Sequence, residues 1–475
     1  MKRLSQNKFV SNVLLSVGVQ IISLAVSFIL NLILPKFIDE YQYSYWQSYV
    51  LYVNYVGILH FGLLDGIVLR YAQYDYDQLD KPKLRSQFYI LLTLISTAAS
   101  IGFLVSSWLQ GVSSIVLVLV SVGTISKNLF TYTSYTFQIT NRIEKYAIIT
   151  IVQRGLYGLG VAALLLLGVK NFFWFCLFDL LGDIFAFLLG LLFNKDIYLG
   201  KGLGIKVAFQ EAKHNIRSGA LLLVSNWFSI LTVGSAKMVV QWRWDELLFG
   251  KISFSFSISN LFLTFIAAVS VVLFPTLKRL EKSQLPNIYK SIRGTISPLL
   301  FYAMLLFFPG CWILAKWLPA YQPSLEYLGI LLPIIIYTSK VSLLTNNYLK
   351  AYRKEKAMFV INIASACLAF MLFVISAFVL NNLWLLLISV VLVMMFGSIA
   401  SEVVVMKIIN MKFISDFVIE AIMTVLFIIC ANMFELWIGC LIYAIILVGY
   451  SIYYRKDLKS ILHQISRFLP RQHGA

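Results

Sequence analysis

The sequence predicts an all-α integral membrane protein of about fourteen transmembrane helices, arranged as two pseudo-symmetric six-helix bundles plus two C-terminal helices. Three observations support this prediction. The 475 residues are 60% hydrophobic and only 13% charged, with a mean hydropathy of +0.83, whereas a soluble domain carries about 25% charged residues. Apolar windows of about 20 residues, the length that crosses a bilayer as a helix, recur along the whole chain. Two short motifs also recur half a chain apart.

The apolar windows, taken in order, place the membrane spans. Each is a continuous hydrophobic run bounded by loops that carry the charged residues. The start of the chain, MKRLSQNKFVSNVLLSVG, is basic and leads into a full-length span, which indicates a retained first helix and not a cleaved signal peptide. The predicted spans are 10–34, 46–69, 87–108, 112–137, 146–168, 171–193, 219–241, 252–275, 295–316, 326–349, 357–380, 383–406, 414–434 and 436–454.

The distribution of basic residues predicts the orientation of these spans. Most of the 39 Lys and Arg residues fall in the termini and in alternate loops, whereas the opposite loops hold only Lys36, Lys170, Arg243, Lys251 and Lys316. The positive-inside rule therefore places both termini in the cytoplasm. This bias accounts for most of the net charge of +18 without a nucleic-acid partner. A basic cytoplasmic rim suits anionic membrane lipids as partners.

Two pairs of similar segments indicate an internal repeat. IDEYQYSYWQSYV (38–50) is echoed by WDELLFGKISFSF (244–256), and NRIEKYAI after the fourth span is echoed by YRKEKAMF after the tenth. Because six is an even number of spans, both halves enter the membrane in the same direction, and the substrate should lie between them. The predicted segments are two bundles (1–193 and 219–407), a cytoplasmic elbow linker (194–218), two added helices (408–454) and a tail (455–475).

The linker and the tail both predict amphipathic helices on the cytoplasmic surface. In the linker an apolar face is flanked by Lys206, Lys213 and Arg217, which is typical of an interfacial helix. The tail segment RKDLKSILHQISRFL follows the same pattern. The apolar face of the linker comprises Ile205, Ala208, Phe209, Ala212 and Ile216.

This architecture resembles the polysaccharide flippase family of the multidrug/oligosaccharidyl-lipid/polysaccharide exporter superfamily. The resemblance lies in the span pattern of the whole chain and in the segments FGLLDGIVLRY (61–71), SNWFSILTVGSAKMVV (225–240), ELLFGKISFSFSISNLF (246–262) and VLFPTLKRL (272–280). It implies transfer of an undecaprenyl-pyrophosphate-linked oligosaccharide from the inner to the outer leaflet of the bacterial inner membrane, for capsule, O-antigen or exopolysaccharide synthesis. It also implies a polysaccharide polymerase and export machinery as partners.

Basic residues inside the predicted spans require an explanation, because each costs about 2.5–3.5 kcal/mol in the hydrocarbon by insertion scales. They are Lys127, Arg154, Lys237 and Lys340. Lys127 and Lys340 hold nearly equivalent places in the fourth and tenth spans, so they can face one another over a central cavity and bind the pyrophosphate. Pairing with a carboxylate is the alternative, as is snorkelling to the interface for Lys237 and Arg154.

Two acidic residues inside the sixth span suggest either a structural role or ion coupling. Asp179 and Asp183 are spaced i, i+4 and therefore share one helix face. They either pair with Arg154 or Lys127, or bind the H+ or Na+ that would power antiport. No other cofactor and no metal site is expected, because the cysteines and histidines show no metal-ligand spacing.

Acidic residues near the predicted cytoplasmic ends suggest a gate and a rim. Asp65 precedes Arg70 at the end of the second span and is expected to pair with a basic residue at a cytoplasmic gate. Glu402, near the cytoplasmic end of the twelfth span, is expected at the rim.

Polar side chains in the fourth and tenth spans are candidates for sugar binding. Asn128, Tyr132 and Thr136 are spaced i, i+4, i+8 on one face, and Asn346 lies in the tenth span. Aromatic faces stack on sugar rings, and amides and hydroxyls bond to sugar hydroxyls. Interhelical hydrogen bonding is the alternative.

Two other function classes fit less well. A drug or cation antiporter of the same superfamily requires an acidic cavity, which the two central lysines disfavour. A membrane polysaccharide polymerase or ligase requires a sizeable external loop with catalytic residues, and the predicted outer loops are short. No P-loop GxxxxGK[ST] occurs, so ATP hydrolysis is not expected, and no catalytic residue is predicted.

Overall fold

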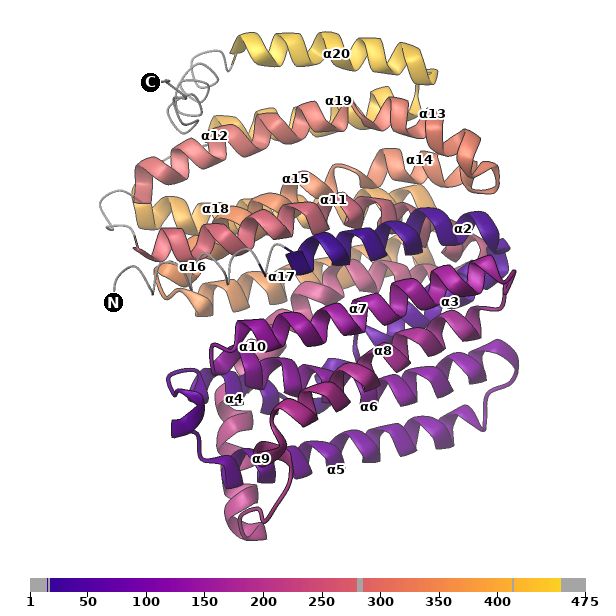
Figure 1. Cartoon of the computed structure of the whole chain (residues 1–475). Coiled ribbons are helices and arrows are strands. Elements are labelled where there is room, and N and C mark those ends of the chain that lie inside the picture. Colours follow the sequence, from indigo (N-terminus) through magenta and orange to yellow (C-terminus); the bar gives the residue numbers. More distant parts are fainter. Residues whose placement is uncertain (1–14, 16–17, 280–284, 412–413, 454–475) are drawn as a thin grey trace, which may run out of the picture. The chain divides into compact units, whose positions relative to one another are not determined.

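The computed structural model describes residue 15 and residues 18–279, 285–411 and 414–453. Throughout these ranges the regular elements are helices and no strand occurs (Figure 1), which confirms the predicted all-α class. The basic N-terminal segment and the tail 455–475 lie outside the described residues. The chain divides into two compact units, Met1–Ser253 and Phe254–Ala475, called unit 1 and unit 2 below. The predicted limits of the bundles, linker and added helices stay predictions.

The predicted spans coincide with helices. Ten helices of the described ranges are long and apolar enough to cross a membrane, and 13 spans result if each of three bent helix pairs counts as one. The thirteen spans predicted before residue 435 each overlap one of these helices or pairs. The fourteenth overlaps α20 (Leu436–Tyr453), which is apolar but shorter. The predicted fold class of about fourteen helices is therefore confirmed.

The helices of unit 1 pack lengthwise against one another, and α5–α6 and α7–α8 are consecutive pairs. α5 packs along α6, α6 along α8, and α8 along α7 (Figure 1). Buried apolar side chains such as Leu91 and Ile95 form the core between them, together with Tyr132. The elements are η1 (Ile29–Ile33), α2 (Leu34–Phe37), α3 (Glu40–Val53), η2 (Val56–His60), α4 (Leu63–Tyr71), η3 (Tyr76–Gln78), α5 (Lys81–Ser106), α6 (Gly111–Ile139), α7 (Ile143–Leu166), α8 (Phe172–Phe193), α9 (Lys195–Tyr198), α10 (Ile205–Arg243) and the first turns of α11 (Glu246–Arg279).

The predicted elbow helix is the first part of α10. This helix runs without a break for 39 residues, or about 58 Å at 1.5 Å per residue. Ala208, Ala212 and Asn215 form its buried stripe, whereas Ile205 and Phe209 are exposed. The predicted apolar face is therefore divided: its alanines and Ile216 pack against the rest of unit 1, and Ile205 and Phe209 point outward.

Three predicted spans are bent and not straight. The chain turns by 60° between η2 and α4, where Phe61 and Gly62 both have positive φ (51° and 84°). In unit 2 the bends are 40° before Phe307 and 52° before Ile334. Continuous hydrophobicity predicts that a segment lies in the membrane, but it does not predict whether its helix is interrupted.

Unit 2 contains the remaining elements. α17 packs along α18, and α19 contacts both α14 and α20. The bent pair Pro319–Leu331 and Ile334–Ala351, which corresponds to the predicted tenth span, includes a π-helical turn that begins at Lys340. After the rest of α11 the elements are α12 (Leu285–Met304), α13 (Phe307–Trp317), η4 (Pro319–Tyr321), α14 (Gln322–Leu331), α15 (Ile334–Ser339), η5 (Lys340–Thr345), α16 (Asn346–Ala351), α17 (Glu355–Val374), η6 (Ile375–Val379), α18 (Leu383–Ile409), α19 (Ile414–Asn432) and α20.

The first sequence echo marks two equivalent helix starts. Asp39 and Asp245 each accept a hydrogen bond from the backbone N–H three residues on, at 2.9 and 2.7 Å, and so cap α3 and α11 in the same way. The repeated small residues also meet: a Cβ built on Gly250 would lie 2.0 Å from the hydroxyl of Ser44.

The second echo marks two equivalent helix-to-helix turns. Asn141 and Arg353 both have left-handed backbone, with φ of 53° and 55°. The following residue, Arg142 or Lys354, donates its N–H to a carbonyl five residues earlier, at 2.9 and 2.8 Å. Both turns thus have the Schellman pattern that ends a helix.

Candidate functional site

Lys127 lies in the interior of unit 1 between two carboxylates. Its Nζ is 2.9 Å from an oxygen of Asp179 and 2.9 Å from an oxygen of Asp183. The two aspartates share one face of α8 and point at α6, as their i, i+4 spacing allows. Asp183 is fully buried, whereas the Lys127 side chain keeps 25% of its surface exposed. These three residues are called the Lys127 cluster.

Neighbouring side chains hold the carboxylates of the Lys127 cluster in place. Tyr49 of α3 donates its hydroxyl to Asp179 at 2.8 Å. Gln153 of α7 donates to Asp183 at 3.1 Å. Each aspartate therefore accepts hydrogen bonds from groups on at least two other helices, which fixes the cluster within the helix bundle.

A second cluster lies in unit 2 around Lys340. Its Nζ is 2.8 Å from Glu402 and 2.5 Å from Glu420. Arg293 contacts the same two glutamates at 3.1 and 3.3 Å and also reaches Asp416 at 2.5 Å. Lys340 is only 1% exposed and Glu402 is not exposed at all. These five residues are called the Lys340 cluster.

Sequence reasoning missed most of the Lys340 cluster. The prediction that Glu402 lies at the rim is wrong, because its carboxylate is buried between Lys340 and Arg293. Arg293 falls just before the predicted span 295–316 and was not singled out, yet it lies within α12 and is 4% exposed. Glu420 and Asp416 were not singled out, although both fall inside a predicted apolar span at i, i+4 spacing. That spacing is the signal that could have found them.

Neither cluster is a site of net positive charge, because in both of them the carboxylates outnumber the basic side chains. Lys127 carries one positive charge against two carboxylates, and the Lys340 cluster carries two positive charges against three carboxylates. With all groups ionised, each cluster has an excess of one negative charge. An anionic ligand would therefore have to displace a carboxylate before it could bind either lysine.

Lys237 and Arg154 are in different surroundings. Neither has a carboxylate within ion-pair distance in the described part of the chain. Lys237, on α10, donates to the side-chain oxygen of Gln47 at 3.2 Å and lies 5.8 Å from the ring centre of Phe249. Arg154 is half-buried on α7. Of the four predicted cations, these two keep a positive charge that no carboxylate offsets in the described residues.

The predicted gate residues belong to two separate contacts. Arg70 does not pair with Asp65 but contacts Glu211 on α10 at 2.8 Å and also donates to the side chain of Asn215. Asp65 is buried and lies 3.9 Å from His60, the nearest basic side chain in an ion-pair contact within the described ranges. Arg70 thus ties the end of α4 to the start of α10.

Glycines let α4 and α10 approach closely beside this contact. A Cβ on Gly66 would lie 1.9 Å from the carbonyl oxygen of Asn215, and one on Gly219 would lie 2.1 Å from that of Gly62. Small residues at i, i+4 spacing permit such backbone contact between membrane helices. The FGLLDG segment therefore forms both the helix break and the contact with α10.

Most of the predicted sugar-binding side chains form hydrogen bonds within unit 1. Asn128 donates to the carbonyl oxygens of Val56 and Thr124, and Tyr132 donates to that of Leu84. Thr136 donates to a carbonyl of its own helix, at 2.7 Å. All three candidates are about 1% exposed, so they are interior residues in this conformation. Asn346, in unit 2, is half-buried.

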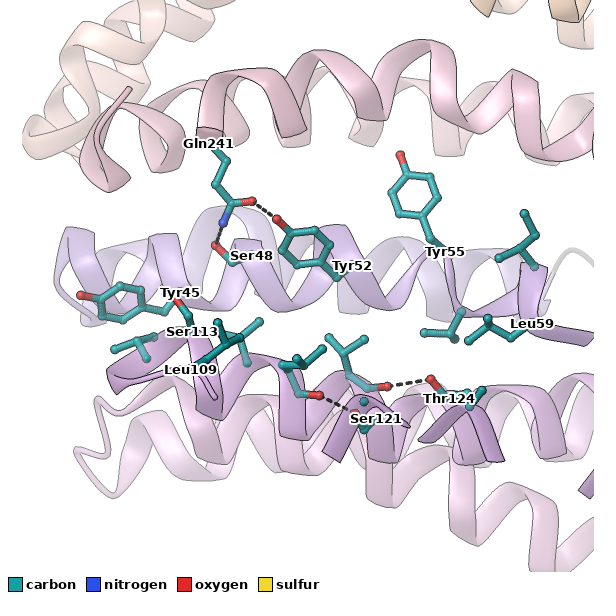
Figure 2. Close-up of a pocket in the computed structure, with 18 of the residues that line it drawn as sticks. Tyr45, Ser48, Tyr52, Tyr55, Leu59, Leu109, Ser113, Ser121, Thr124 and Gln241 are labelled. Carbon is teal, nitrogen blue, oxygen red and sulfur yellow. Dashed lines mark hydrogen bonds between the residues drawn. The ribbon is translucent and has the colours of Figure 1, made fainter. Parts of the chain in front are cut away.

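A cavity of about 450 Å³ lies beside the first half of α6, between α3 and the α5–α6 pair (Figure 2). Tyr45, Ser48 and Tyr52 line it from one face of α3, and Gln241 reaches it from α10. Ser121 and Thr124 line it from α6. The cavity belongs to unit 1 and combines hydroxyl groups with aliphatic walls.

Comparison with known proteins supports the architecture described above. No protein-family model and no curated protein matches the chain. Among solved structures, the lipid II flippase MurJ in an inward closed conformation has a TM-score of 0.66 and 13% identity, over 96% of this chain and 99% of that one. The chain has the fold of MurJ and of MATE transporters.

Two MATE structures support the same fold. An inward-facing multidrug resistance MATE family transporter of the MOP superfamily has a TM-score of 0.63 and 12% identity, over 84% of this chain and 98% of that one. MATE in the straight conformation has a TM-score of 0.54 and 12% identity, over 84% and 96%. At such low identity the likeness establishes the fold alone, and the function must be argued separately.

Proposed function

We propose that this protein is a flippase that moves undecaprenyl-pyrophosphate-linked oligosaccharide repeat units from the inner to the outer leaflet of the bacterial cytoplasmic membrane by alternating access. The exported glycan would serve capsule, O-antigen or exopolysaccharide synthesis. The supporting observation is coverage: the likeness to a lipid II flippase extends over 96% of the chain, whereas the MATE likeness extends over 84%. A larger part of this chain therefore aligns with the lipid flippase than with the drug transporter.

The uncompensated cations suit a pyrophosphate ligand. A diphosphate needs replacement of its hydration when it leaves water, and lysine and arginine side chains provide this as donors and as charges. Lys237 and Arg154 are the candidates whose charge is not already offset by a carboxylate in the described residues. Lys127 and Lys340 would join them only after release from their carboxylates, and uptake of H+ or Na+ by the carboxylates would make that release possible.

The proposal includes an orientation and partners. Both termini would lie in the cytoplasm, where the basic loops meet anionic lipids. A polysaccharide polymerase and export machinery would receive the translocated repeat unit. The protein itself would perform no covalent chemistry.

A multidrug or cation antiporter of the same superfamily is the second candidate. The observation that favours it is the excess of carboxylates in the Lys127 cluster, because two aspartates face one lysine there. Such a pair can bind a coupling ion or attract a cationic compound.

Translocation in proteoliposomes tests the proposal. The probe is a fluorescent undecaprenyl-pyrophosphate disaccharide, and its arrival in the opposite leaflet is measured by quenching. We expect transfer by the wild-type chain, a reduction of at least tenfold for the double variant Lys237→Gln/Arg154→Gln, and little change for Lys170→Gln, which removes an exposed charge. Transfer that does not exceed that of empty vesicles would contradict the proposal. Efflux of ethidium without lipid transfer would instead support the antiporter.

A further inference from the structure

The cavity shown in Figure 2 is large enough for a ligand and lies in one half of unit 1. Its volume of about 450 Å³ falls within the range of about 300–1,000 Å³ that is usual for small-molecule sites. The lining residues come from α3 and η2, the second half of α5, the first half of α6, the end of α10 and the start of α11. This half is the one that the positive-inside rule predicts to face the outer leaflet.

One side of the cavity is a fixed row of hydrogen-bonding groups. Tyr52 donates its hydroxyl to the side-chain oxygen of Gln241 at 2.8 Å, and the Gln241 amide donates to Ser48 at 2.8 Å. Ser48 in turn donates to a backbone carbonyl of α3. Because an amide offers two N–H donors and two acceptor lone pairs, Gln241 keeps one of each for a ligand. The row is therefore preorganised and still able to bind.

Tyr55 adds a further hydroxyl and an aromatic ring. Figure 2 shows its ring standing between α3 and α10 beside this row. A Cβ on Gly234 of α10 would lie 1.4 Å from the Tyr55 hydroxyl oxygen, so the glycine provides the space for this side chain. The hydroxyl makes no hydrogen bond to the described residues, which leaves it able to donate to a ligand.

The opposite wall is aliphatic and also carries Ser113, Ser121 and Thr124. Val116, Leu117 and Val120 of α6 form much of this wall. Ser121 and Thr124 donate to carbonyls of their own helix at 2.7 and 3.0 Å, so their oxygens keep acceptor lone pairs. The ligand would thus meet apolar surface and hydroxyl groups together.

The charge of the lining distinguishes among the parts of a lipid-linked glycan. The lining residues include one carboxylate, Glu246, and neither lysine nor arginine. A diphosphate would be repelled and would find no cation there. A hydrocarbon chain would remove Gln241 and Tyr55 from water without replacing their hydrogen bonds. A sugar ring offers hydroxyls to these groups and C–H surface to the tyrosine rings and the aliphatic wall.

We infer that this cavity is a binding site for an uncharged, hydroxyl-bearing sugar ring. The inference rests on the proposed function, because the ring would belong to the glycan of the translocated lipid. It gives that glycan a contact in unit 1 separate from the cations proposed for the pyrophosphate, beside the part of α6 that precedes Asn128, Tyr132 and Thr136.

Native mass spectrometry of the full-length chain in detergent tests the inference with two probes, undecaprenyl pyrophosphate alone and undecaprenyl pyrophosphate that carries a neutral disaccharide. We expect the wild-type chain to bind the disaccharide-bearing probe more tightly. Each lost hydrogen bond should weaken that binding by about three- to tenfold. Gln241→Leu and Tyr55→Phe should therefore each reduce binding of the disaccharide-bearing probe and leave the sugar-free probe within twofold.

Two control variants accompany this test. Gln210→Leu makes the same change at an exposed site on α10, and Tyr74→Phe removes a hydroxyl from an exposed tyrosine; both should bind like the wild type. Tyr55→Phe removes one atom without an internal hydrogen bond, so a loss cannot be attributed to misfolding. Equal losses for both probes would show that the cavity holds the polyprenyl chain and would overturn the inference, as would unchanged binding in both variants. The readout is binding, so it stays measurable even if translocation, and with it the proposed function, fails.

Discussion

Replacement of Lys340 by methionine should destabilise the protein strongly. Methionine is also unbranched and apolar, so the change removes the charge while keeping much of the packing. In the Lys340 cluster the ammonium group lies 2.8 Å from Glu402 and 2.5 Å from Glu420, and neither glutamate side chain is more than 3% exposed. After the substitution, Arg293 alone would face three carboxylates.

The expected loss follows from the cost of an uncompensated buried charge. Removing one partner of a buried ion pair typically costs about 3–5 kcal/mol, because the remaining charge has neither water nor a counter-ion. Protonation of one glutamate would limit this cost. A loss of about 3 kcal/mol corresponds to a fall in melting temperature of about 6–12 °C for a unit of this size.

Thermal unfolding of the purified full chain in detergent measures this effect. The double variant Lys340→Met/Glu420→Gln removes the stranded charge as well, so it should recover most of the lost stability. Lys350→Met is the matched control, because Lys350 is exposed at the end of α16. If Lys340→Met melts like the wild type, or if the double variant is no more stable than the single one, the buried ion-pair account of unit 2 is refuted.

Two further predictions concern the contacts that hold the ends of helices in unit 1. Gly66→Ala should destabilise the protein by about 1–3 kcal/mol through overpacking, because its Cβ would lie 1.9 Å from the backbone oxygen of Asn215; Gly57→Ala, with no atom within 4 Å, should melt like the wild type, and equal melting of both variants would contradict the close contact. Burial raises the pKa of Asp196 on α9, but the hydrogen bonds from Lys81 and Tyr76, together with the charge of Lys81, outweigh it and hold that pKa below its ordinary value of 3.8. A lowered native pKa stabilises the fold above the unfolded pKa and is lost as the pH falls, so the melting temperature of the wild type should exceed that of Asp196→Asn at pH 6 and approach it below about pH 3.8; a difference that does not change with pH would contradict this.

The sequence was sufficient for the architecture because hydropathy is a local property. Every apolar window of about 20 residues corresponds to a helix or a bent pair. The repeated Asp-Glu segments also have a local structural role, since Asp39 and Asp245 each cap the N-terminus of a helix. The bend before α4 was not predicted, because continuous hydrophobicity conceals the left-handed backbone of Phe61 and Gly62.

The charged clusters show which contacts could not be predicted from the spacing of residues in the sequence. Sequence spacing placed Asp179 and Asp183 on one face, and one of the two pairings considered for them was with Lys127, which the structure places between them. Sequence spacing did not predict the contact of Arg293 with Glu420, because these residues are 127 positions apart and lie on different helices. Such pairings depend on how helices pack, and no periodicity within one helix records that.

The cavity of unit 1 was also beyond sequence reasoning. No binding role was predicted for Tyr45, Ser48 and Tyr52, although their i, i+3, i+7 spacing places them on one face of α3. Whether a face with such residues lines a cavity depends on the volume left by the opposing helices. That volume is a property of the assembled unit.

The most direct test of the central proposal is a comparison of two transport reactions in the same proteoliposomes. Leaflet-to-leaflet transfer of a fluorescent undecaprenyl-pyrophosphate oligosaccharide and efflux of ethidium would be measured for the wild-type chain and for empty vesicles. The flippase account predicts transfer of the lipid-linked glycan well above that of empty vesicles, without ethidium efflux. Ethidium efflux together with lipid transfer no faster than in empty vesicles would contradict it.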